Sequence, residues 1–557
     1  MGTTAESTTR PPRNDGQWAW GQREPLNANE VFKAEDDGLN VRARVEEIYS
    51  RQGFASIPGD DLRGRLRWWG LYTQRKPGID GGRTASIPPE ELEDEFFMLR
   101  IRSDGGRLTL EQLRTIANIS IEFGRSTADV TDRQNIQLHW VRIEDVPEIW
   151  RRLEAVGLTT GEACGDTPRV ILGSPVAGVA ADEIIDGTPA IESIVRRYIL
   201  DPEFSNLPRK FKTAISGSPR LDVAHEINDV SFVGVVHPEQ GPGFDLWVGG
   251  GLSTNPHLAV RLGAWVPLQE VPEVWAAVVA IFRDYGYRRL RNKARLKFLV
   301  ADWGAQRFRE VLETEYLHRG LIDGPAPEAP TGGRNDHLGV NAQKDGRFYI
   351  GAAPAVGRLS GEALLGLADI AAGVGSDRLH LTAQQKVMML NVERELVESA
   401  VTAIEALGLQ VRPSSFLRGT MACTGVEYCK LAMVETKGRA VQLISELEQR
   451  LPDFAKPLSI HVNGCPNSCA RIQVADIGLK GIRLTDDDGS DVEGFQVHLG
   501  GALGQRANFG RTVRGLKVKA RDLPDYIEQL LRTFDEEADD DMSFAEWAVG
   551  ADEGLLQ

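Results

Sequence analysis

A repeat with a fixed offset of 251 residues constrains the fold of this chain more than any other feature of its sequence. Phe97 and Phe348 stand at this offset, and so do Arg107 and Arg358. The offset is also kept by Thr131-x-x-Gln134-x-Ile136 and Thr382-x-x-Gln385-x-Val387, Gly157-Leu158 and Gly408-Leu409, and Gly249-Gly250-x-Leu252 and Gly500-Gly501-x-Leu503. One offset held at separated sites indicates a tandem duplication, preceded by a unique arm of about 90 residues.

Each half begins with the same pattern of apolar residues. In the first half this pattern predicts a strand, a helix, a strand and a helix, at residues 95–102, 109–123, 134–142 and 146–157. Residues 358–409 repeat this β-α-β-α unit. We therefore expect an α+β fold whose halves are related by a pseudo-twofold axis.

Four of the five cysteines lie in the second half, as C-x5-C from Cys423 to Cys429 and C-x3-C from Cys465 to Cys469. Asp229-Val-x-Phe-x-Gly234 matches Asp476-Ile-x-Leu-x-Gly481 at an offset of 247 (476 − 229), which places Ser218 opposite Cys465 and Asp222 opposite Cys469. The first half therefore lacks the thiols. Conversely, Arg100 of the first half stands opposite Gly351 of the second. Sulfur in one half and positive charge in the other predict a single shared site.

Four clustered thiols have three explanations. Structural zinc usually uses two C-x2-4-C pairs, which the C-x5-C spacing does not match. Disulfides are rare in a reducing cytoplasm. An iron–sulfur cluster accepts varied spacings and is favoured, with zinc as the alternative.

Composition narrows the class of protein. A net charge of −16 disfavours nucleic acid as the main partner. No apolar run approaches the roughly 18 residues of a membrane helix, and residues 1–6 do not begin a secretory signal, so we expect a cytoplasmic protein. No Gly-x-Gly-x-x-Gly motif opens a βαβ unit, so electrons for a redox reaction have to arrive from another protein.

The two cysteine motifs are recognisable. Cys423-Thr-Gly-Val-Glu-Tyr-Cys429 together with Asn463-Gly-Cys465-Pro-Asn-Ser-Cys469 resembles the sirohaem and [4Fe-4S] site of the assimilatory sulfite and nitrite reductases. The resemblance includes the duplicated halves, spans roughly residues 18 to 530, and is strongest to the ferredoxin-dependent sulfite reductases. It implies ferredoxin-like half-domains, two sirohaem and cluster-binding domains, and a six-electron reduction of sulfite to sulfide.

The same resemblance assigns roles to single residues. The cluster ligands are Cys423, Cys429, Cys465 and Cys469, and Cys469 is also the axial ligand of the sirohaem iron. The residues that match the family's anion-binding set are Arg100, Arg169, Lys210 and Lys212, while Arg133 matches a sirohaem contact. Because side chains two apart share a strand face, we add Arg102 to the cofactor contacts. Reduced ferredoxin is the implied electron donor, and we expect a monomer.

Two further expectations follow from the resemblance. Plant-type nitrite reductases tend to carry Asn where this chain has Lys212, and an added ammonium favours dianionic sulfite over nitrite. Ferredoxin–nitrite reductase is the alternative within the family, and a zinc-stabilised binding protein is the alternative outside it.

Some family members join a Tyr and a Cys by a thioether, at places that match Tyr72 and Cys164. The other interpretation of Cys164 is a reduced, semi-buried thiol.

We expect seven segments. They are an N-terminal arm that wraps the core (1–90), a first ferredoxin-like half-domain (91–160), a first sirohaem and substrate-binding domain (161–320), a linker (321–338), a second ferredoxin-like half-domain (339–410), a [4Fe-4S] and sirohaem-binding domain (411–534) and an acidic, solvated C-terminal tail (535–557). Two basic runs, at residues 63–67 and 288–297, are candidates for docking an acidic ferredoxin.

Overall fold

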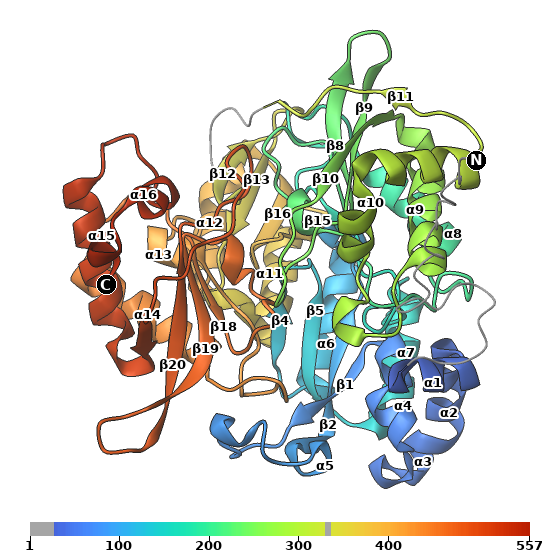
Figure 1. The fold of residues 1–557 in the computed structure, drawn as a ribbon, viewed down its shortest axis with the longest axis horizontal. Helices are drawn as coiled ribbons and strands as arrows, with labels where there is room; N and C mark the ends of the chain where they lie inside the picture. The colour runs from blue at the N-terminus through green and yellow to red at the C-terminus, as the bar shows by residue number, and fades with distance from the viewer. Residues whose placement is uncertain (1–26, 329–335) are drawn as a thin grey trace, which may run out of the picture.

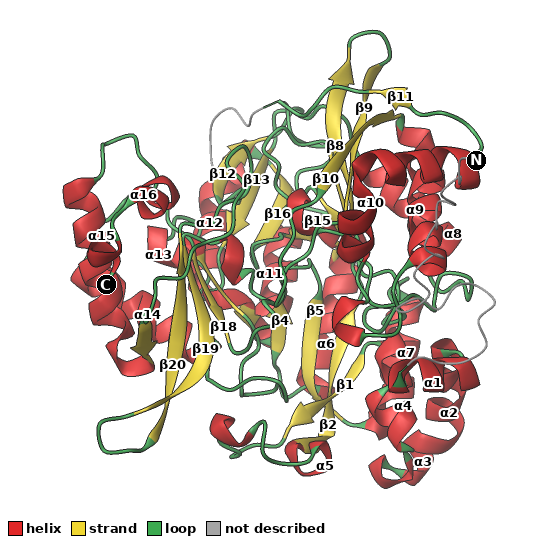
Figure 2. Ribbon diagram, in the orientation of Figure 1, coloured by secondary structure: helices red, strands yellow, loops and turns green. Residues whose placement is uncertain are grey.

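The computed structural model describes residues 27–328 and 336–557. Strands β1 to β21 form four sheets, which lie between helices in Figure 2. The first sheet has the order β1-β2-β5-β4-β14. These strands are β1 (Leu71–Arg75), β2 (Glu93–Ile101), β5 (Ile136–Val141), β4 (Ala128–Val130) and β14 (Arg358–Leu359). Helices α6 (Leu110–Phe123) and α7 (Val146–Ala155) complete the unit that the sequence predicted.

The second sheet has the matching order β12-β13-β16-β15-β3. Its strands are β12 (Gly339–Ala342), β13 (Phe348–Ala352), β16 (Val387–Val392), β15 (Arg378–Leu381) and β3 (Arg107–Thr109). Its helices are α11 (Gly361–Gly373) and α12 (Val397–Ala406). Helix α11 packs against α6, and the two half-domains share one hydrophobic core.

The two half-domains exchange short strands. Strand β14, from the second half, pairs with β4 at the edge of the first sheet. Strand β3, from the first half, pairs with β15 at the edge of the second sheet. Each sheet is therefore completed by the other repeat, as a pseudo-twofold axis requires.

The third and fourth sheets also match. The third sheet, β11-β10-β9-β8-β7-β6, consists of β11 (Ile322–Asp323), β10 (Val260–Val266), β9 (Gly241–Val248), β8 (Val230–His237), β7 (Thr213–Ser216) and β6 (Leu172–Gly173). The fourth sheet, β17-β18-β19-β20-β21, consists of β17 (Thr420–Ala422), β18 (Ile460–Asn463), β19 (Ile477–Thr485), β20 (Asp491–Leu499) and β21 (Lys517–Lys519). In both sheets two parallel pairings are followed by a long antiparallel hairpin.

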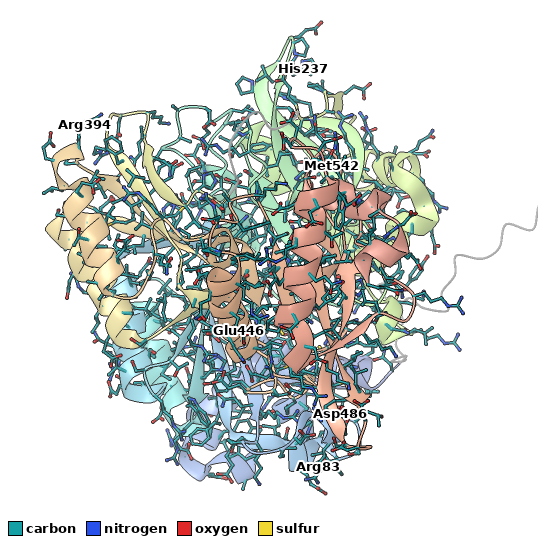
Figure 3. All side chains as sticks on the ribbon, turned by 90° about the vertical axis from the view of Figure 1, so that its left-hand side faces the viewer. Arg83, His237, Arg394, Glu446, Asp486 and Met542 are labelled. Atoms are coloured by element: carbon teal, nitrogen blue, oxygen red, sulfur yellow. The ribbon has the colours of Figure 1, made fainter. Side chains whose placement is uncertain are left out.

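These hairpins point to opposite ends of the molecule. In Figure 3, His237 marks the tip of the β8–β9 hairpin at the top, and Asp486 marks the tip of the β19–β20 hairpin near the bottom. The expected α+β fold, duplicated about a pseudo-twofold axis, is therefore confirmed.

The remaining helices cover the two ends of the molecule in Figure 1. Helices α8 (Thr188–Tyr198), α9 (Val271–Tyr285) and α10 (Leu296–Val311) lie on one side, and α13 (Ser415–Gly419), α14 (Lys437–Arg450), α15 (Leu523–Glu537) and α16 (Phe544–Gly550) on the other. The N-terminal helices are α1 (Ala28–Glu35), α2 (Val41–Arg44), α3 (Ser50–Gln52), α4 (Gly59–Arg63) and α5 (Pro89–Leu92). Within the described ranges, no helix has the length and apolar character to cross a bilayer.

The ends of the chain differ from the sequence-based expectation in two places. The arm does more than wrap the core, because its strand β1 is hydrogen-bonded to β2 and extends the first sheet. The expected solvated tail at residues 535–557 is wrong. Helix α15 continues to Glu537, and α16 buries Phe544 and Trp547. The free energy gained by burying these aromatic side chains holds the segment against the protein, although the acidic run before it favours solvent. The linker begins with β11, and its residues 329–335 lie outside the described residues.

Candidate active site

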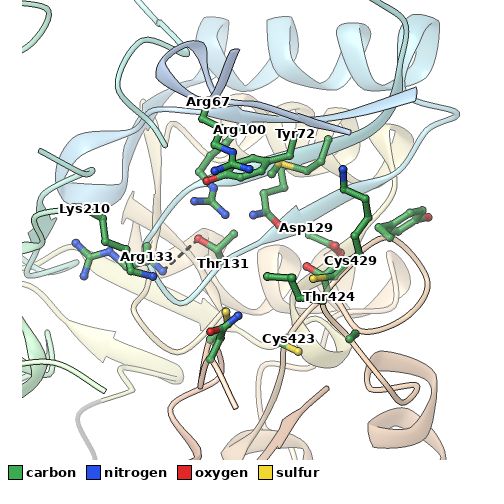
Figure 4. A pocket seen from close by; sticks show the side chains of 18 of the residues that line it. Arg67, Tyr72, Arg100, Asp129, Thr131, Arg133, Lys210, Cys423, Thr424 and Cys429 are labelled. Carbon is green, nitrogen blue, oxygen red and sulfur yellow. Dashed lines mark hydrogen bonds between the residues drawn. The ribbon is translucent and has the colours of Figure 1, made fainter. Parts of the chain in front are cut away.

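A cavity of about 450 Å³ lies between the first sheet and the loops of the fourth sheet. All four clustered cysteines line it, together with residues from β1, β2, β4 and β5. Figure 4 shows Arg67, Arg100 and Tyr72 on one wall, facing Cys423 on the other. The structure thus brings the sulfur of one repeat and the cations of the other into one site.

The fourth sheet holds the cysteine loops by its backbone. Cys423 directly follows β17, and its N–H donates to the carbonyl of Val462 at 3.0 Å. Its Sγ accepts a hydrogen bond of 3.2 Å from the N–H of Gly464. Asn463 spans the second loop: its Nδ2 donates to the Cys465 carbonyl, and its Oδ1 accepts from the N–H of Ala470 at 2.9 Å. The loops are shaped by groups other than the thiols.

Burial controls the protonation of these thiols. It raises the pKa of Cys465 to about 12, and it also raises the pKa of Cys423 and Cys429 above the usual thiol range. Thiols must lose their protons to ligate metal, so metal binding here releases protons.

Cations outnumber carboxylates around the cavity. The lining cations are Arg67, Arg100, Arg133, Arg169, Arg209, Lys210, Arg291, Lys430 and Lys437, and the lining carboxylates are Asp129, Asp132 and Asp166. Six of the cations form no salt bridge with any carboxylate of the described chain: Arg67, Arg100, Arg133, Arg169, Arg209 and Lys210. Unpaired cations in a closed site favour an anionic ligand.

Three of the predicted anion-binding residues meet at this cavity. Arg100 comes from β2, and its counterpart Gly351 has no room for a side chain, because a Cβ there would lie 2.1 Å from the carbonyl oxygen of His337. The Arg169 guanidinium is held by backbone, with Nη2 donating to the carbonyl of Gly165 at 2.9 Å. Burial, followed by the charge of Lys212, lowers the pKa of Lys210 well below the usual lysine range.

Lys212 lies behind this group. It lines a smaller neighbouring cavity of about 10 Å³, whose other walls include Asn228 and Arg471. That space is about the size needed for one water molecule. Asp132 and Arg133 line both cavities and separate Lys212 from the larger one. Burial, together with the charge of Arg133, lowers the pKa of Lys212 to about 7.

Arg133 fits the role of a cofactor contact, whereas Arg102 does not. Arg133 Nη1 donates to Asn228 Oδ1 at 2.6 Å, and its buried Nε has no hydrogen-bond partner among the described residues. Arg102 is 3% exposed, forms a salt bridge of 2.7 Å with Asp104, and does not line the larger cavity in the described chain. The Arg102 guanidinium is held instead by Asp104 and by the backbone carbonyls of Glu162, Pro168 and Arg169.

The structure places Tyr72 and Cys164 close together. Cys164 is fully buried, and the ring of Tyr72 lines the cavity with the Arg67 guanidinium 5.5 Å from its centre. Burial, and then the neighbouring Cys164, raises the pKa of the Tyr72 hydroxyl.

Sequence reasoning missed a group of cavity residues around Asp129. The Asp129 carboxylate accepts from His139 Nε2 at 3.1 Å and from Arg358 Nε at 2.7 Å, and Lys437 Nζ lies 3.3 Å away. The His139 ring stacks on Tyr428, the residue before Cys429. In the sequence, His139 falls within the strand predicted at residues 134–142, and no pattern marks Asp129 as a cavity residue.

The two basic runs proposed for ferredoxin docking are largely internal. Arg65 is buried with Asp61, and Arg67 lines the cavity. In the second run Arg295 is buried against Asp229, and Lys297 donates to three backbone carbonyls. Neither run is a continuous surface patch.

The donor set fits an iron–sulfur cluster beside a polyanionic group. A single zinc ion binds sulfur at about 2.3 Å and draws its ligands together. Across residues 27–328 and 336–557, no three Cys, His, Asp or Glu side chains converge closely enough to hold one ion. The cysteines instead surround a space, and the excess of cations, with the free Nε of Arg133, suits the carboxylates of sirohaem.

Comparison with known families decides the class. Residues 164–320 and 414–546 match the nitrite and sulphite reductase 4Fe-4S domain, and residues 90–156 and 341–407 match the nitrite/sulfite reductase ferredoxin-like half domain. The chain belongs to the nitrite and sulfite reductase family. This family excludes the zinc-stabilised binding protein, and the alternation of the two domain types agrees with the four sheets.

Members of this family from mycobacteria are similar over their full length. "Sulfite reductase [ferredoxin] 2" of Mycolicibacterium paratuberculosis is 59% identical, with 99% of this chain and 100% of the relative covered. "Sulfite reductase [ferredoxin]" of Mycobacterium tuberculosis is 58% identical at the same coverage. "Ferredoxin--nitrite reductase" of Synechococcus elongatus is 38% identical over 91% of this chain and 96% of its own.

A solved structure shares the fold closely. The Mycobacterium tuberculosis NirA protein superposes with a TM-score of 0.96 at 57% identity, with 98% of this chain and 100% of that one covered.

Proposed function

We propose that this protein is a ferredoxin-dependent sulfite reductase, which reduces sulfite to sulfide with six electrons. One observation carries the proposal: a single cavity joins four cysteine thiols to six cations that form no salt bridge with a carboxylate of the described chain. This chain is 58–59% identical to the mycobacterial sulfite reductases and 38% identical to a cyanobacterial nitrite reductase. This difference in identity supports sulfite, and not nitrite, as the substrate.

Cys423, Cys429, Cys465 and Cys469 would hold the [4Fe-4S] cluster, and Cys469 would also ligate the sirohaem iron. When bound, these groups supply the iron that binds sulfite and the route by which electrons reach it. Arg133, Arg67 and Arg209 would bind the sirohaem carboxylates, because each charge-assisted hydrogen bond to a carboxylate is stronger than a neutral one.

Arg100, Arg169 and Lys210 would hold the sulfite anion. Their side chains line the cavity near one another, and a dianion needs several cations at once to replace its water shell. Each sulfite oxygen leaves as water and takes up two protons. A lysine whose pKa is lowered gives up its proton more readily, which makes Lys210 and, from the smaller neighbouring cavity, Lys212 suitable proton donors.

Tyr72 and Cys164 are proposed to form a thioether. The bond would join a phenol ring carbon to sulfur with loss of two hydrogens, and it needs an oxidant such as molecular oxygen. It would fix the Tyr72 ring on the cavity wall, beside Arg67. A reduced Cys164 thiol remains the alternative. We further propose a cytoplasmic monomer.

Turnover with two substrates tests the proposal. Purified protein is assayed with reduced ferredoxin and with a reduced viologen dye, on sulfite and on nitrite in separate reactions. We expect a larger kcat/KM for sulfite with both donors. A clear preference for nitrite would assign the protein to the ferredoxin–nitrite reductases, whose members are its more distant relatives.

A further inference from the structure

The repeated motif Thr-x-x-Gln forms the same turn in both halves of the chain. In the first half, the Thr131 hydroxyl accepts from the N–H groups of Arg133 and Asn135 at 3.1 and 3.2 Å. In the second half, the Thr382 hydroxyl accepts from the N–H groups of Gln384 and Lys386 at 3.2 and 3.1 Å, respectively. The equivalent bonds show that the motif is a structural device, used twice.

The glutamine of each turn has an uncommon backbone conformation. Gln134 has a φ of 56° and Gln385 a φ of 61°, in the left-handed region that non-glycine residues rarely occupy. Such a conformation persists where the surrounding structure fixes it, and it often serves a function. Here it directs both amides toward the edge of a sheet.

Each glutamine side-chain amide pairs with one residue of an edge strand, in the way that the backbone of a neighbouring strand would. Gln134 Nε2 donates to the Gly173 carbonyl at 2.9 Å, and its Oε1 accepts from the Gly173 N–H at 3.0 Å. Gln385 Nε2 donates to the Ala422 carbonyl at 2.9 Å, and its Oε1 accepts from the Ala422 N–H at 3.2 Å. Gly173 ends β6 and Ala422 ends β17, and both are edge strands of their sheets. The side chains thus satisfy peptides that the sheet leaves unpaired.

The residue after the clamped peptide differs between the halves. After Gly173 comes Ser174, whose hydroxyl donates to the buried Asp222 at 2.7 Å. After Ala422 comes Cys423, the first thiol of the cluster site. Gln385 also lines the cavity, whereas Gln134 is not among its described lining residues. The same clamp is therefore adjacent to a metal ligand in only one half.

We propose that Gln385 is a positioning residue for Cys423, which fixes the peptide before it so that its thiol faces the cluster. The inference rests on the proposed function for the presence of the cluster. On the other side of β17, the Cys423 N–H is bonded to Val462 of β18. Between Gln385 and β18, the backbone that carries this thiol is held from both sides, which restricts the direction of its Sγ.

The pseudo-twofold gives a matched control for the test. Gln385→Met and Gln134→Met each remove a buried clamp while keeping the length of the side chain. Gln134 also donates to the Leu381 carbonyl at 2.8 Å, so its loss removes at least as many hydrogen bonds. We expect both variants to lower the thermal midpoint, measured by far-UV circular dichroism on the holoprotein.

The stability of the cluster should distinguish the two variants. With an iron chelator, the visible absorption of Gln385→Met should decay about tenfold faster than that of the wild type, because two buried hydrogen bonds beside a ligand are lost. Gln134→Met should decay at the wild-type rate. The electron paramagnetic resonance spectrum of the reduced cluster should change only in Gln385→Met.

Equal decay in the two Met variants would overturn the proposal, since the effect would then be a general loosening of the fold. A wild-type decay rate in Gln385→Met would overturn it as well. If a Met variant does not fold, the milder pair Gln385→Asn and Gln134→Asn, each one methylene shorter, is compared in the same way. Wild-type protein lacking iron and acid-labile sulfide would instead refute the proposed function.

Discussion

The ring of His139 stacks on the ring of Tyr428, with centroids 3.8 Å apart and planes inclined by 16°. His139 belongs to β5 of the first repeat, and Tyr428 precedes Cys429 in the second. A strand of one repeat thus supports a cysteine loop of the other. Asp129 Oδ2 lies within hydrogen-bond distance of the imidazole Nε2, at 3.1 Å.

Two substitutions separate the stack from the hydrogen bond. His139→Phe keeps an aromatic ring against Tyr428 and loses the bond to the Asp129 carboxylate, so we expect a loss of about 2 kcal/mol in the free energy of unfolding. His139→Ala also loses the stack and leaves a cavity, with an expected loss of about 3 kcal/mol and a lower iron content. Denaturant titration and iron analysis measure both. Equal losses in the two variants would show that the stack contributes nothing.

Sulfite binding should depend on single cations of the cavity wall. Arg169→Ala and Lys210→Ala each remove one charge-assisted hydrogen bond, worth roughly 1.5–3 kcal/mol, so the KM for sulfite should rise about 10- to 100-fold. A viologen donor is used, because it avoids any change in ferredoxin docking. Arg196→Ala, an exposed residue of α8, is the control and should keep the wild-type KM. An unchanged KM in Lys210→Ala would remove that residue from the anion site.

Stability should depend on pH through Glu162. This carboxyl is fully buried, and burial raises its pKa to about 8, against about 4.3 in an unfolded chain. The folded state therefore holds a proton that the unfolded state releases, and this contribution to stability is lost as pH rises from about 5 to 8.

Glu162→Gln mimics the protonated acid and keeps an acceptor for the Leu200 N–H, which lies 2.7 Å from Glu162 Oε2. Its thermal midpoint should exceed that of the wild type at pH 8 and approach it at pH 5. The exposed control Glu111→Gln on α6 should follow the wild type at both pH values. A difference that stays constant with pH would mean that Glu162 is ionised in the folded protein.

Two cysteine substitutions should have different spectroscopic consequences. Cys469→Ser is expected to lose both the cluster and the axial sulfur of the sirohaem iron, so both sets of visible bands should change. Cys164→Ser should keep both sets. Peptide masses of the wild type should show the loss of two hydrogens across the Tyr72 and Cys164 peptides. A full complement of hydrogens there would establish the reduced thiol instead.

The sequence predicted features that leave a local or periodic signal. The 251-residue offset predicted two equivalent half-domains, and the strands and helices of the first lie within a few residues of their expected positions. The cysteine spacing predicted the cavity's sulfur wall. The repeat offset and the cysteine spacing can both be read from the linear sequence, because they depend only on the order of residues along the chain.

Contacts between distant segments left no such signal. Arg209 and Arg291 line the cavity, but a single arginine in a sequence looks the same whether it faces a cofactor or water. Lys210 and Lys212 are two residues apart and were assigned together, yet the structure gives them different cavities, divided by Asp132. Only the packing of three sheets around one space distinguishes them.

The exchange of β3 and β14 between repeats has a consequence for biosynthesis. While the ribosome is still translating the first repeat, β4 has no neighbour on its outer edge, because Arg358 and Leu359 have not yet been made. Such an edge can pair with another nascent chain. The first sheet therefore reaches its native strand complement only after about two-thirds of the polypeptide exists. Either repeat, expressed alone, would expose an unpaired strand at the edge of its half-domain sheet.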